Sequence, residues 1–111
     1  MARRFVPDTG DIVWLEFSPQ AGHEQAGRRP TLVLSPAAYN KNGMMLCCPM
    51  TSQIKGYPFE VIVRTKEAGG AVLSDQVKSL DWRARKAIPK GKISAGELDE
   101  VRGKISALLN L

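Results

Sequence analysis

The chain has 111 residues, which leaves room for one hydrophobic core and predicts a single domain over residues 1–111. Hydrophobic residues make up 43%, charged residues make up 24% and the formal net charge is +5, values that exclude an intrinsically disordered chain. The longest apolar run is Met44 to Cys48, far below the ~20 residues of a membrane span, and the first residues carry no apolar signal segment, so we expect neither membrane insertion nor export.

Six short segments have the β-branched and aromatic composition of strands, and turns rich in Gly, Pro, Asn or Lys separate them. These segments are Asp11–Phe17, Thr31–Ser35, Met44–Met50, Pro58–Val63, Ala71–Ser74 and Val77–Trp82. A helical turn is expected at residues 36–40, and Asn42 with Gly43 should turn the chain into the following strand. This pattern predicts a mainly β fold, a small barrel or sandwich.

The end of the chain changes from strand to helix periodicity. Leu98, Val101 and Ile105, followed by Leu108 and Leu109, fall on one face of a helix. Residues 94–97 read Ser-Ala-Gly-Glu, the sequence of a capping box at a helix start. We therefore expect one C-terminal amphipathic helix packed on the β core.

The longest expected loop, Ser18–Arg28, leads into a buried strand and carries the first group of candidate functional residues. It brings His23, Glu24 and Gln25 close in sequence to Arg28 and Arg29 at the strand entry. An imidazole, a carboxylate and guanidinium groups at the junction of a loop and a rigid element are typical of a working site. A surface ion pair between Glu24 and Arg29 is the alternative interpretation.

Two further polar groups interrupt apolar segments. Thr51, Ser52 and Gln53 follow the third strand, where hydroxyl groups can donate to a phosphate oxygen. Asp75 and Gln76 follow the fifth strand, and such side chains beside arginines can read base edges. Each group can also be an ordinary turn.

Cysteine and histidine usage excludes several kinds of site. Cys47 and Cys48 are neighbours in an expected strand, so their side chains point to opposite faces and do not bridge. With one histidine in the chain, a Cys/His zinc site and a two-histidine ribonuclease centre within one subunit are excluded. We expect no metal and no cofactor, and the free thiols suit a reducing cytoplasm.

The net positive charge is concentrated in one segment, which we call the basic segment, residues 76–92. Six basic side chains face one acidic residue there, a net charge of +5, whereas the rest of the chain is neutral on balance. The basic residues are Lys78, Arg83, Arg85, Lys86, Lys90 and Lys92. This concentration predicts a surface that follows a phosphate backbone, and the alternative is a solvated loop that keeps the protein soluble.

Ordered motifs along nearly the whole chain resemble the MazF/PemK family of toxin endoribonucleases, with the MazF branch the more similar. The matching stretches are PDTGD at 7–11, Trp14, GHEQAGRRP at 22–30, LSP at 34–36, KGYPFEV at 55–61, DQVKS at 75–79 and WRAR at 82–85. The resemblance implies a small SH3-like barrel of the CcdB/PemK type with a C-terminal helix. It also implies a homodimer and a cognate antitoxin that lays an acidic C-terminal segment over the basic groove.

The implied activity is sequence-specific, metal-independent cleavage of single-stranded RNA, leaving a 2′,3′-cyclic phosphate and a free 5′-hydroxyl. By the resemblance, Arg29 and Thr51 are catalytic residues and Glu24 is the important loop carboxylate. Leu73 stands where the PemK branch has an arginine acid, which favours the MazF arrangement. Asp75 and His23 remain alternatives to Glu24 as the general base.

The remaining candidates are assigned to RNA binding, either along the backbone or at unstacked bases. They are His23, Gln25, Arg28, Ser52, Gln53, Lys55, Asp75, Gln76, Lys78, Arg83, Arg85 and Lys86. Two other functions stay open on the same fold. One is a CcdB-like toxin that poisons gyrase, although this chain lacks the tryptophan-bearing tail of that group, and the other is a non-catalytic RNA-binding module.

Overall fold

The computed structural model describes residues 5–17, 27–65 and 69–111 of the chain. Its elements are β1 (Asp11–Phe17), β2 (Gly27–Val33), α1 (Ala37–Asn40), β3 (Met44–Thr51), β4 (Glu60–Val63), β5 (Gly70–Leu73), β6 (Lys78–Asp81), β7 (Ile88–Lys92) and α2 (Ala95–Leu109). The prediction of a mainly β fold with one C-terminal amphipathic helix is therefore confirmed, as is the helical turn before β3.

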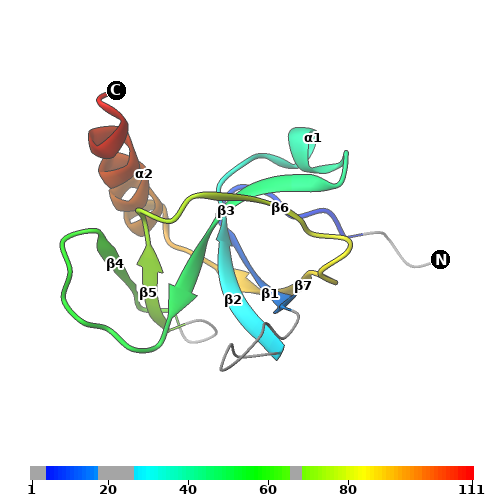
Figure 1. The fold of residues 1–111 in the computed structure, drawn as a ribbon, viewed down its shortest axis with the longest axis horizontal. Helices are drawn as coiled ribbons and strands as arrows, with labels where there is room; N and C mark the ends of the chain where they lie inside the picture. Colours follow the sequence, from blue (N-terminus) through cyan, green and yellow to red (C-terminus); the bar gives the residue numbers. More distant parts are fainter. Residues whose placement is uncertain (1–4, 18–26, 66–68) are drawn as a thin grey trace.

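The strands form a curled antiparallel sheet with the order β4-β5-β3-β2-β1-β7 (Figure 1). The central strand β3 pairs with two strands along one edge. Its residues Met44–Cys47 pair with β6, and its last two residues, Met50 and Thr51, pair with β5. On its other edge β3 pairs with β2, between Thr31 and Pro49 at one end and Val33 and Cys47 at the other. The sheet consequently wraps into a half-barrel around β3.

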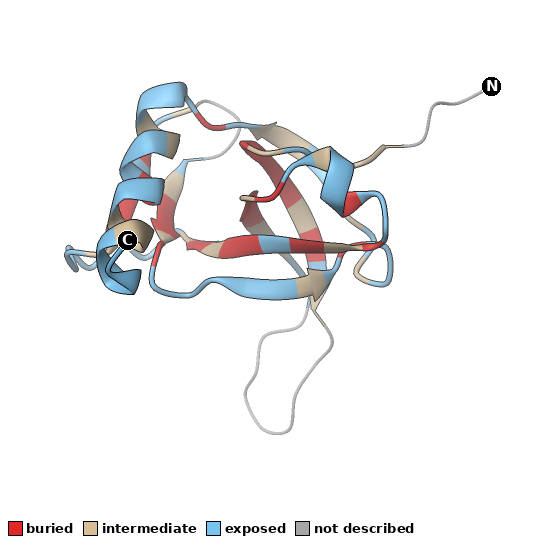
Figure 2. Cartoon of the chain, turned by 90° about the horizontal axis from the view of Figure 1, so that it is seen from above, coloured by how far each residue is buried: buried red, intermediate tan, exposed pale blue. Residues whose placement is uncertain are grey.

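Each face of the sheet has its own hydrophobic core, because successive strand residues point to opposite sides. Ile12 and Cys48 belong to the core that α2 covers through Val101, whereas Val13 and Cys47 belong to the core that Trp82 closes. Viewed from above, α2 is exposed along its outer side, and the buried residues lie mainly on the strands of the curled sheet (Figure 2). The two cysteines are free and lie in different cores, which confirms that neighbouring positions in the strand keep them apart.

The predicted capping box begins α2. The Ser94 side chain accepts a hydrogen bond from the Glu97 backbone N–H at 3.2 Å, and the Glu97 carboxylate accepts in return from the Ser94 backbone. Glu97 also accepts from the Arg64 backbone N–H at 3.0 Å, just after β4. The cap thus fixes both the start of the helix and its position on the sheet.

Neither described helix is long and apolar enough to cross a bilayer.

The prediction of six strands is wrong by one, because β7 has no recognisable strand pattern. Its sequence, Ile-Pro-Lys-Gly-Lys, contains a proline, a glycine and two lysines, residues depleted in central strands. At the end of the sheet path they are tolerated, since an edge strand needs no donor on its outer side and charged side chains protect it.

Strand β2 also begins at Gly27, four residues before the predicted start. Pro30 and the two arginines make this stretch resemble a loop in the sequence. In the structure Arg28, Arg29 and Pro30 all pair with β1, whereas the pairing with β3 begins only at Thr31. The first half of β2 therefore behaves as an edge, where a proline is accommodated.

Candidate active site

A hollow of about 520 Å³ opens beside the end of β3, and we call it the β3-end hollow. Four neighbouring strands and the chain on either side of them contribute its lining. The lining residues are Trp14, Arg28, Arg29, Pro30, Met50, Thr51, Ser52, Gln53, Gly69 and Lys90. Arg29 and Thr51, two of the three predicted catalytic residues, lie at this one place although they are far apart in the sequence.

The strand register explains why these two residues meet. The last pair between β2 and β3 joins Thr31 to Pro49. Arg29 and Thr51 each lie two residues beyond this last pair on their own strands, so the end of the ladder brings both to the same hollow. On its other side Arg29 pairs with Leu15 of β1, a fully buried residue. The guanidinium stem is thus attached to the rigid core and not to a loop.

Thr51 is held in place on two sides. Its hydroxyl oxygen accepts a hydrogen bond from the Gln53 backbone N–H at 3.0 Å, which uses a lone pair and not the hydroxyl proton. Gly70 approaches it from β5 so closely that a Cβ there would lie 2.7 Å from the Thr51 carbonyl oxygen. Gly70 also has φ +136°, in the region that favours glycine. The backbone of Thr51 consequently has little room to shift.

Five lining residues are not among the site residues predicted from the sequence, and two of them, Trp14 and Lys90, contact each other. The ammonium of Lys90 lies 4.4 Å from the centre of the Trp14 ring, a cation–π contact between β7 and β1. In the sequence Trp14 is only a motif residue, and Lys90 contributes only to the charge of the basic segment. The position of Lys90 could not be found without β7, because the pairing of Trp14 with Ile88 is what brings it here.

The structure gathers only part of the predicted set in the hollow. Arg28, Ser52 and Gln53 join Arg29 and Thr51 there. His23, Glu24 and Gln25 lie outside the described residues. The side chains predicted to bind RNA that do not line the hollow are Lys55, Asp75, Gln76, Lys78, Arg83, Arg85 and Lys86.

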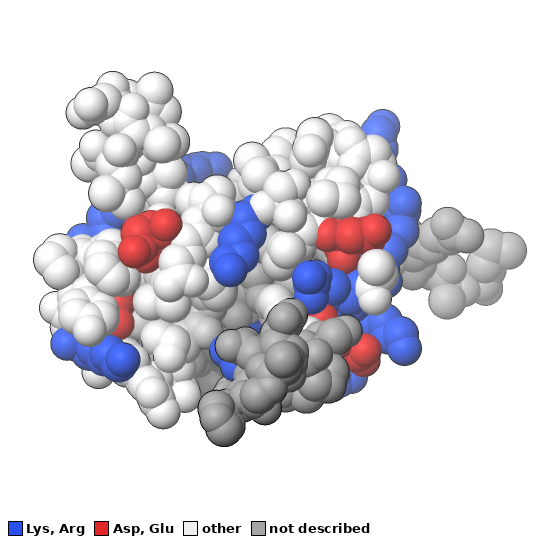
Figure 3. All heavy atoms as spheres, in the orientation of Figure 1, with Lys and Arg blue, Asp and Glu red and all other residues white. Residues whose placement is uncertain are grey.

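Apart from Lys90, the basic side chains of the basic segment do not line the hollow and are spread over the surface. Figure 3 shows Lys and Arg side chains scattered over one face of the molecule, with acidic side chains between them. Lys78 lies on β6 opposite Cys47, four residues from Thr51 along β3, a separation of about 13 Å at the usual strand rise. Lys86 occupies a turn with φ +54°.

Both arginines of the segment are used to hold the barrel together. Arg83 donates to the Lys41 carbonyl at 2.7 Å and stacks over Trp82 at 4.9 Å. Arg85 donates to the Glu16 carbonyl at 3.3 Å and stacks over Phe17 at 4.8 Å. Their charge is retained, but their geometry is set by the protein.

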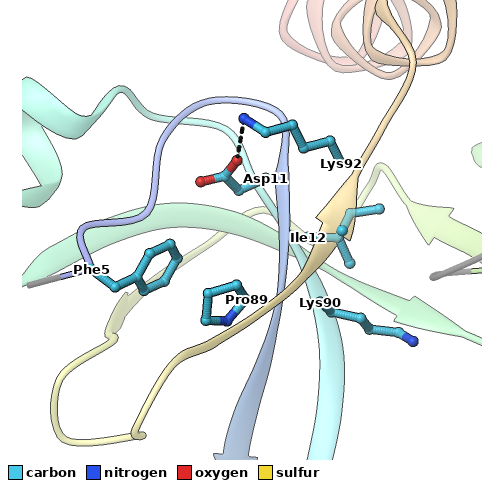
Figure 4. A pocket seen from close by; sticks show the side chains of 7 residues that line it. Phe5, Asp11, Ile12, Pro89, Lys90 and Lys92 are labelled. Carbon is cyan, nitrogen blue, oxygen red and sulfur yellow. Dashed lines mark ion pairs between the residues drawn. The ribbon is translucent and has the colours of Figure 1, made fainter. Parts of the chain in front are cut away.

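A second, smaller hollow lies beside β7 and includes both of its lysines. It is lined by Phe5, Asp11, Ile12, Pro89, Lys90, Gly91 and Lys92 and has a volume of about 370 Å³. Lys92 reaches Asp11 at 3.1 Å, whereas Lys90 points away from that carboxylate (Figure 4). Two cations in one strand thus have different surroundings, one in an ion pair and the other on an aromatic ring beside Thr51.

Burial removes the cysteines from the set of candidate nucleophiles. Desolvation raises the pKa of Cys47 to about 12 and that of Cys48 to about 12, so both stay protonated near neutral pH.

Hydrogen bonds from the backbone N–H groups of Ala37 and Thr9 lower the pKa of Asp8. The bond from Ala37 connects Asp8 to the first residue of α1. Among residues 5–17, 27–65 and 69–111, no three His, Cys, Asp or Glu side chains are grouped so that they could hold a metal ion.

The sequence matches a known protein family over almost its whole length. A family described as the PemK-like, MazF-like toxin of type II toxin–antitoxin systems matches residues 8–109. The endoribonuclease toxin MazF of Escherichia coli strain K12 is 53% identical over 110 residues, which cover 98% of this chain and 99% of that protein. The endoribonuclease toxin ChpB of the same strain is 33% identical over 115 residues, with 98% and 99% covered.

Solved structures agree with this similarity. A MazE–MazF complex from Deinococcus radiodurans has a chain that superposes with a TM-score of 0.91 at 55% identity, covering 97% of this chain and 99% of that one. A crystal structure of MazF from the same organism superposes with a TM-score of 0.86 at 55% identity, covering 97% and 100%. The half-barrel with a C-terminal helix is therefore the fold of these toxins.

Proposed function

The chain belongs to the PemK-like, MazF-like toxin family of type II toxin–antitoxin systems, and from this membership we propose where and how it cleaves RNA. It is an endoribonuclease toxin with a cognate antitoxin as partner. The two other functions open from the sequence, gyrase poisoning and RNA binding without cleavage, lose their support, because full-length relatives are named endoribonucleases. The substrate is single-stranded RNA, chiefly mRNA, cut at a short recognition sequence in the β3-end hollow.

Arg29 and Thr51 bind the scissile phosphate. A guanidinium presents two parallel N–H donors to two phosphate oxygens, and the Thr51 hydroxyl adds a third donor from the neighbouring strand. These donors act most strongly when negative charge grows on the five-coordinate phosphorus, so they lower the barrier more than they strengthen binding. The position of both residues in one hollow, with their backbones held by β1 and β5, supports this assignment.

The nucleophile is the 2′-hydroxyl of the RNA itself. A general base removes its proton, the 2′-oxygen bonds to phosphorus, and the bond from phosphorus to the 5′-oxygen breaks as that oxygen receives a proton from a general acid. The products are a 2′,3′-cyclic phosphate and a 5′-hydroxyl. No water has to be activated in this step, so the reaction proceeds without a metal. DNA is not cut, because it lacks the 2′-hydroxyl. We assign the base to Glu24, with His23 and Asp75 as the other candidates.

The bound strand extends from the hollow along the protein surface. Nucleotides next to the scissile phosphate contact the other polar and aromatic side chains of the hollow, which are Arg28, Ser52, Gln53 and the Trp14–Lys90 pair. An aromatic ring beside a cation suits a base and its phosphate. Farther residues of the predicted set then contact flanking phosphates and bases, among them Lys55, Gln76, Lys78, Arg83, Arg85 and Lys86.

The same basic surface accounts for inhibition by the antitoxin. A segment rich in acidic residues at the C-terminus of the antitoxin competes with RNA for these cations and blocks the hollow. The active toxin is a cytoplasmic homodimer, so that two hollows are available per molecule.

The observation that carries this proposal is the meeting of Arg29 with Thr51 at one hollow. Incubation of the purified protein with a long RNA in EDTA, followed by mapping of the cut ends, tests it. We expect undiminished cleavage at a recurring short sequence, with cyclic phosphate and 5′-hydroxyl ends. Activity that returns only when a divalent ion is added, or 5′-phosphate ends, would contradict the mechanism.

A further inference from the structure

We propose that Glu60 is a positioning residue for the RNA-cleaving site, because its carboxylate holds the loop that carries Ser52 and Gln53 to the hollow. Glu60 is the first residue of β4 and does not line the hollow itself. This role rests on the function proposed above and adds a residue to which no part of the reaction has been assigned.

The Glu60 carboxylate binds three consecutive backbone N–H groups. One oxygen, Oε1, accepts from Gly56 at 2.8 Å, from Tyr57 at 3.2 Å and from Lys55 at 3.2 Å. The other oxygen, Oε2, accepts from Lys55 at 3.3 Å. Successive N–H groups that converge in this way form an anion-binding nest, and Gly56, with φ +80°, supplies the left-handed conformation that the nest requires.

Burial makes this contact more than a surface interaction. Glu60 is only 9% exposed, whereas residues 52–58 are all exposed. A carboxylate accepting several N–H bonds forms charge-assisted hydrogen bonds, and these are stronger than bonds between neutral groups. The loop has no strand partner over these residues, so the buried carboxylate supplies the fixed point that a ladder would otherwise provide.

The fixed point lies next to the site in sequence. Only Ile54 separates Gln53, which lines the hollow, from Lys55, which binds Glu60. At the other end, the Gln53 N–H donates to the Thr51 hydroxyl, the proposed catalytic group. The segment from Thr51 to Lys55 is therefore held at both ends, by β3 and by Glu60. Release of the second end leaves Ser52 and Gln53 attached on one side only.

Additional contacts keep the far part of the loop in place without Glu60. Lys104 of α2 donates to the Pro58 carbonyl at 2.5 Å, and the rings of Tyr57 and Phe59 stack with centroids 5.3 Å apart. Removal of the carboxylate should consequently loosen residues 52–57 without unfolding the β4–β5 pair, a separation that allows an experiment on folded protein.

The test compares Glu60→Ala and Glu60→Gln with a matched control, Glu97→Ala. Glu97 is also a carboxylate that accepts backbone N–H bonds and links two elements, but it acts at α2. Amide hydrogen exchange reports whether the loop is held, independently of any activity. Steady-state cleavage of an RNA oligonucleotide gives KM and kcat, and Thr51→Ala in the same assay tests the proposed site separately.

For Glu60→Ala we expect amide exchange of residues 55–57 to be at least about tenfold faster than in the parent protein. KM should rise about tenfold, because binding must now order the loop, and kcat should fall less. Glu60→Gln retains one acceptor oxygen and should recover to within about threefold of the parent protein. Glu97→Ala should lower the melting temperature without changing KM or the exchange of residues 55–57.

Two results would overturn the role of Glu60: unchanged exchange of the loop, or faster exchange with KM and kcat unaltered. If Glu60→Ala does not fold, Gly56→Ala strains the same nest with the carboxylate present and must raise KM in the same way. Full activity of Thr51→Ala is a different result, since it removes the proposed site while leaving the exchange data on Glu60 intact.

Discussion

The β3-end hollow and the basic segment both carry cationic side chains, but they arise from the sequence in different ways. Residues of the hollow come from β1, β2, β3 and β7 and converge because the strands are in register. Residues of the basic segment are neighbours in sequence, yet the curled sheet distributes them, and Arg83 and Arg85 bind carbonyl groups of the barrel. A high density of charge along a chain therefore does not by itself make a high density of charge in space.

The two regions also differ in what they can do to a phosphate. Arg29 is half-buried, attached to a core strand and in the same hollow as the Thr51 hydroxyl group, so it can act on one particular phosphate. Lys78 is exposed on a short strand and suits attraction along the RNA backbone. We expect mutations of Arg29 or Thr51 to change the rate of cleavage, and mutations of the basic segment, Lys90 included, to change the salt dependence of binding.

The largest effect should come from Arg29→Ala. Removal of charge-assisted donors that act in the transition state should lower the single-turnover cleavage rate about a hundredfold to a thousandfold, by analogy with removal of an oxyanion-hole donor. Binding of an uncleavable 2′-deoxy analogue should weaken far less. Arg29→Lys retains the charge without the planar fork, so it should restore binding and leave cleavage slow. A folded Arg29→Ala protein with full activity would end the catalytic assignment.

The second prediction concerns the support of Thr51. Gly70→Ala places a methyl group 2.7 Å from the Thr51 carbonyl, so β5 and the end of β3 must separate. A shift of about 1 Å in a catalytic group can cost up to about a hundredfold in rate, and we expect a decrease on the order of tenfold or more.

Gly10→Ala is the matched control for this change. It has the same kind of positive φ, +89°, but its nearest contacts are ordinary, at 3.7 and 3.8 Å to side chains away from the hollow. Both variants should lose stability in thermal melts, because both impose backbone strain. Equal cleavage rates in the two folded proteins would show that the close approach of Gly70 has no functional role.

The sequence predicts some elements of the fold and not others. The mainly β fold, the C-terminal helix and its cap follow from local patterns, since the Ser94 and Glu97 spacing and the helical face need no information from elsewhere. The strand β7 could not be predicted, because its proline, glycine and lysines are acceptable only at a sheet edge. Edge position is a property of the whole topology and not of the segment.

For the site, the sequence predicts individual residues but not which of them lie together in space. Arg29 and Thr51 are identified by motifs, but their meeting depends on the register between β2 and β3. Lys90 is not identifiable as a site residue from sequence, because it reaches Trp14 through the pairing of β7 with β1. Glu60 occurs in the KGYPFEV motif, but the sequence does not predict its contacts, because the three N–H groups that it binds belong to the backbone.

The third prediction tests the basic segment as a surface for the RNA backbone. Combined substitution of Lys78, Arg83 and Arg85 by glutamine should lower the slope of log affinity against log salt by about 2, at ~0.7 for each phosphate of a single strand that the variant no longer neutralises. The cleavage rate at saturating RNA should stay close to that of the parent protein, because none of the three lines the hollow. An unchanged slope would place the binding of the RNA backbone elsewhere.

The smallest effect separates two lysines of one strand. Lys90 lines the β3-end hollow and lies over Trp14, whereas Lys92 does not line that hollow and is paired with Asp11. Lys90→Gln should lower the salt slope by about 0.7, the value for one neutralised phosphate, while Lys92→Gln should leave it unchanged. Stability should change little in either variant, because the Lys92 side chain is 79% exposed and exposed ion pairs contribute little. Since the two substitutions remove the same charge from the same strand, equal changes in slope would mean that RNA responds only to net charge and that the hollow gives Lys90 no separate role.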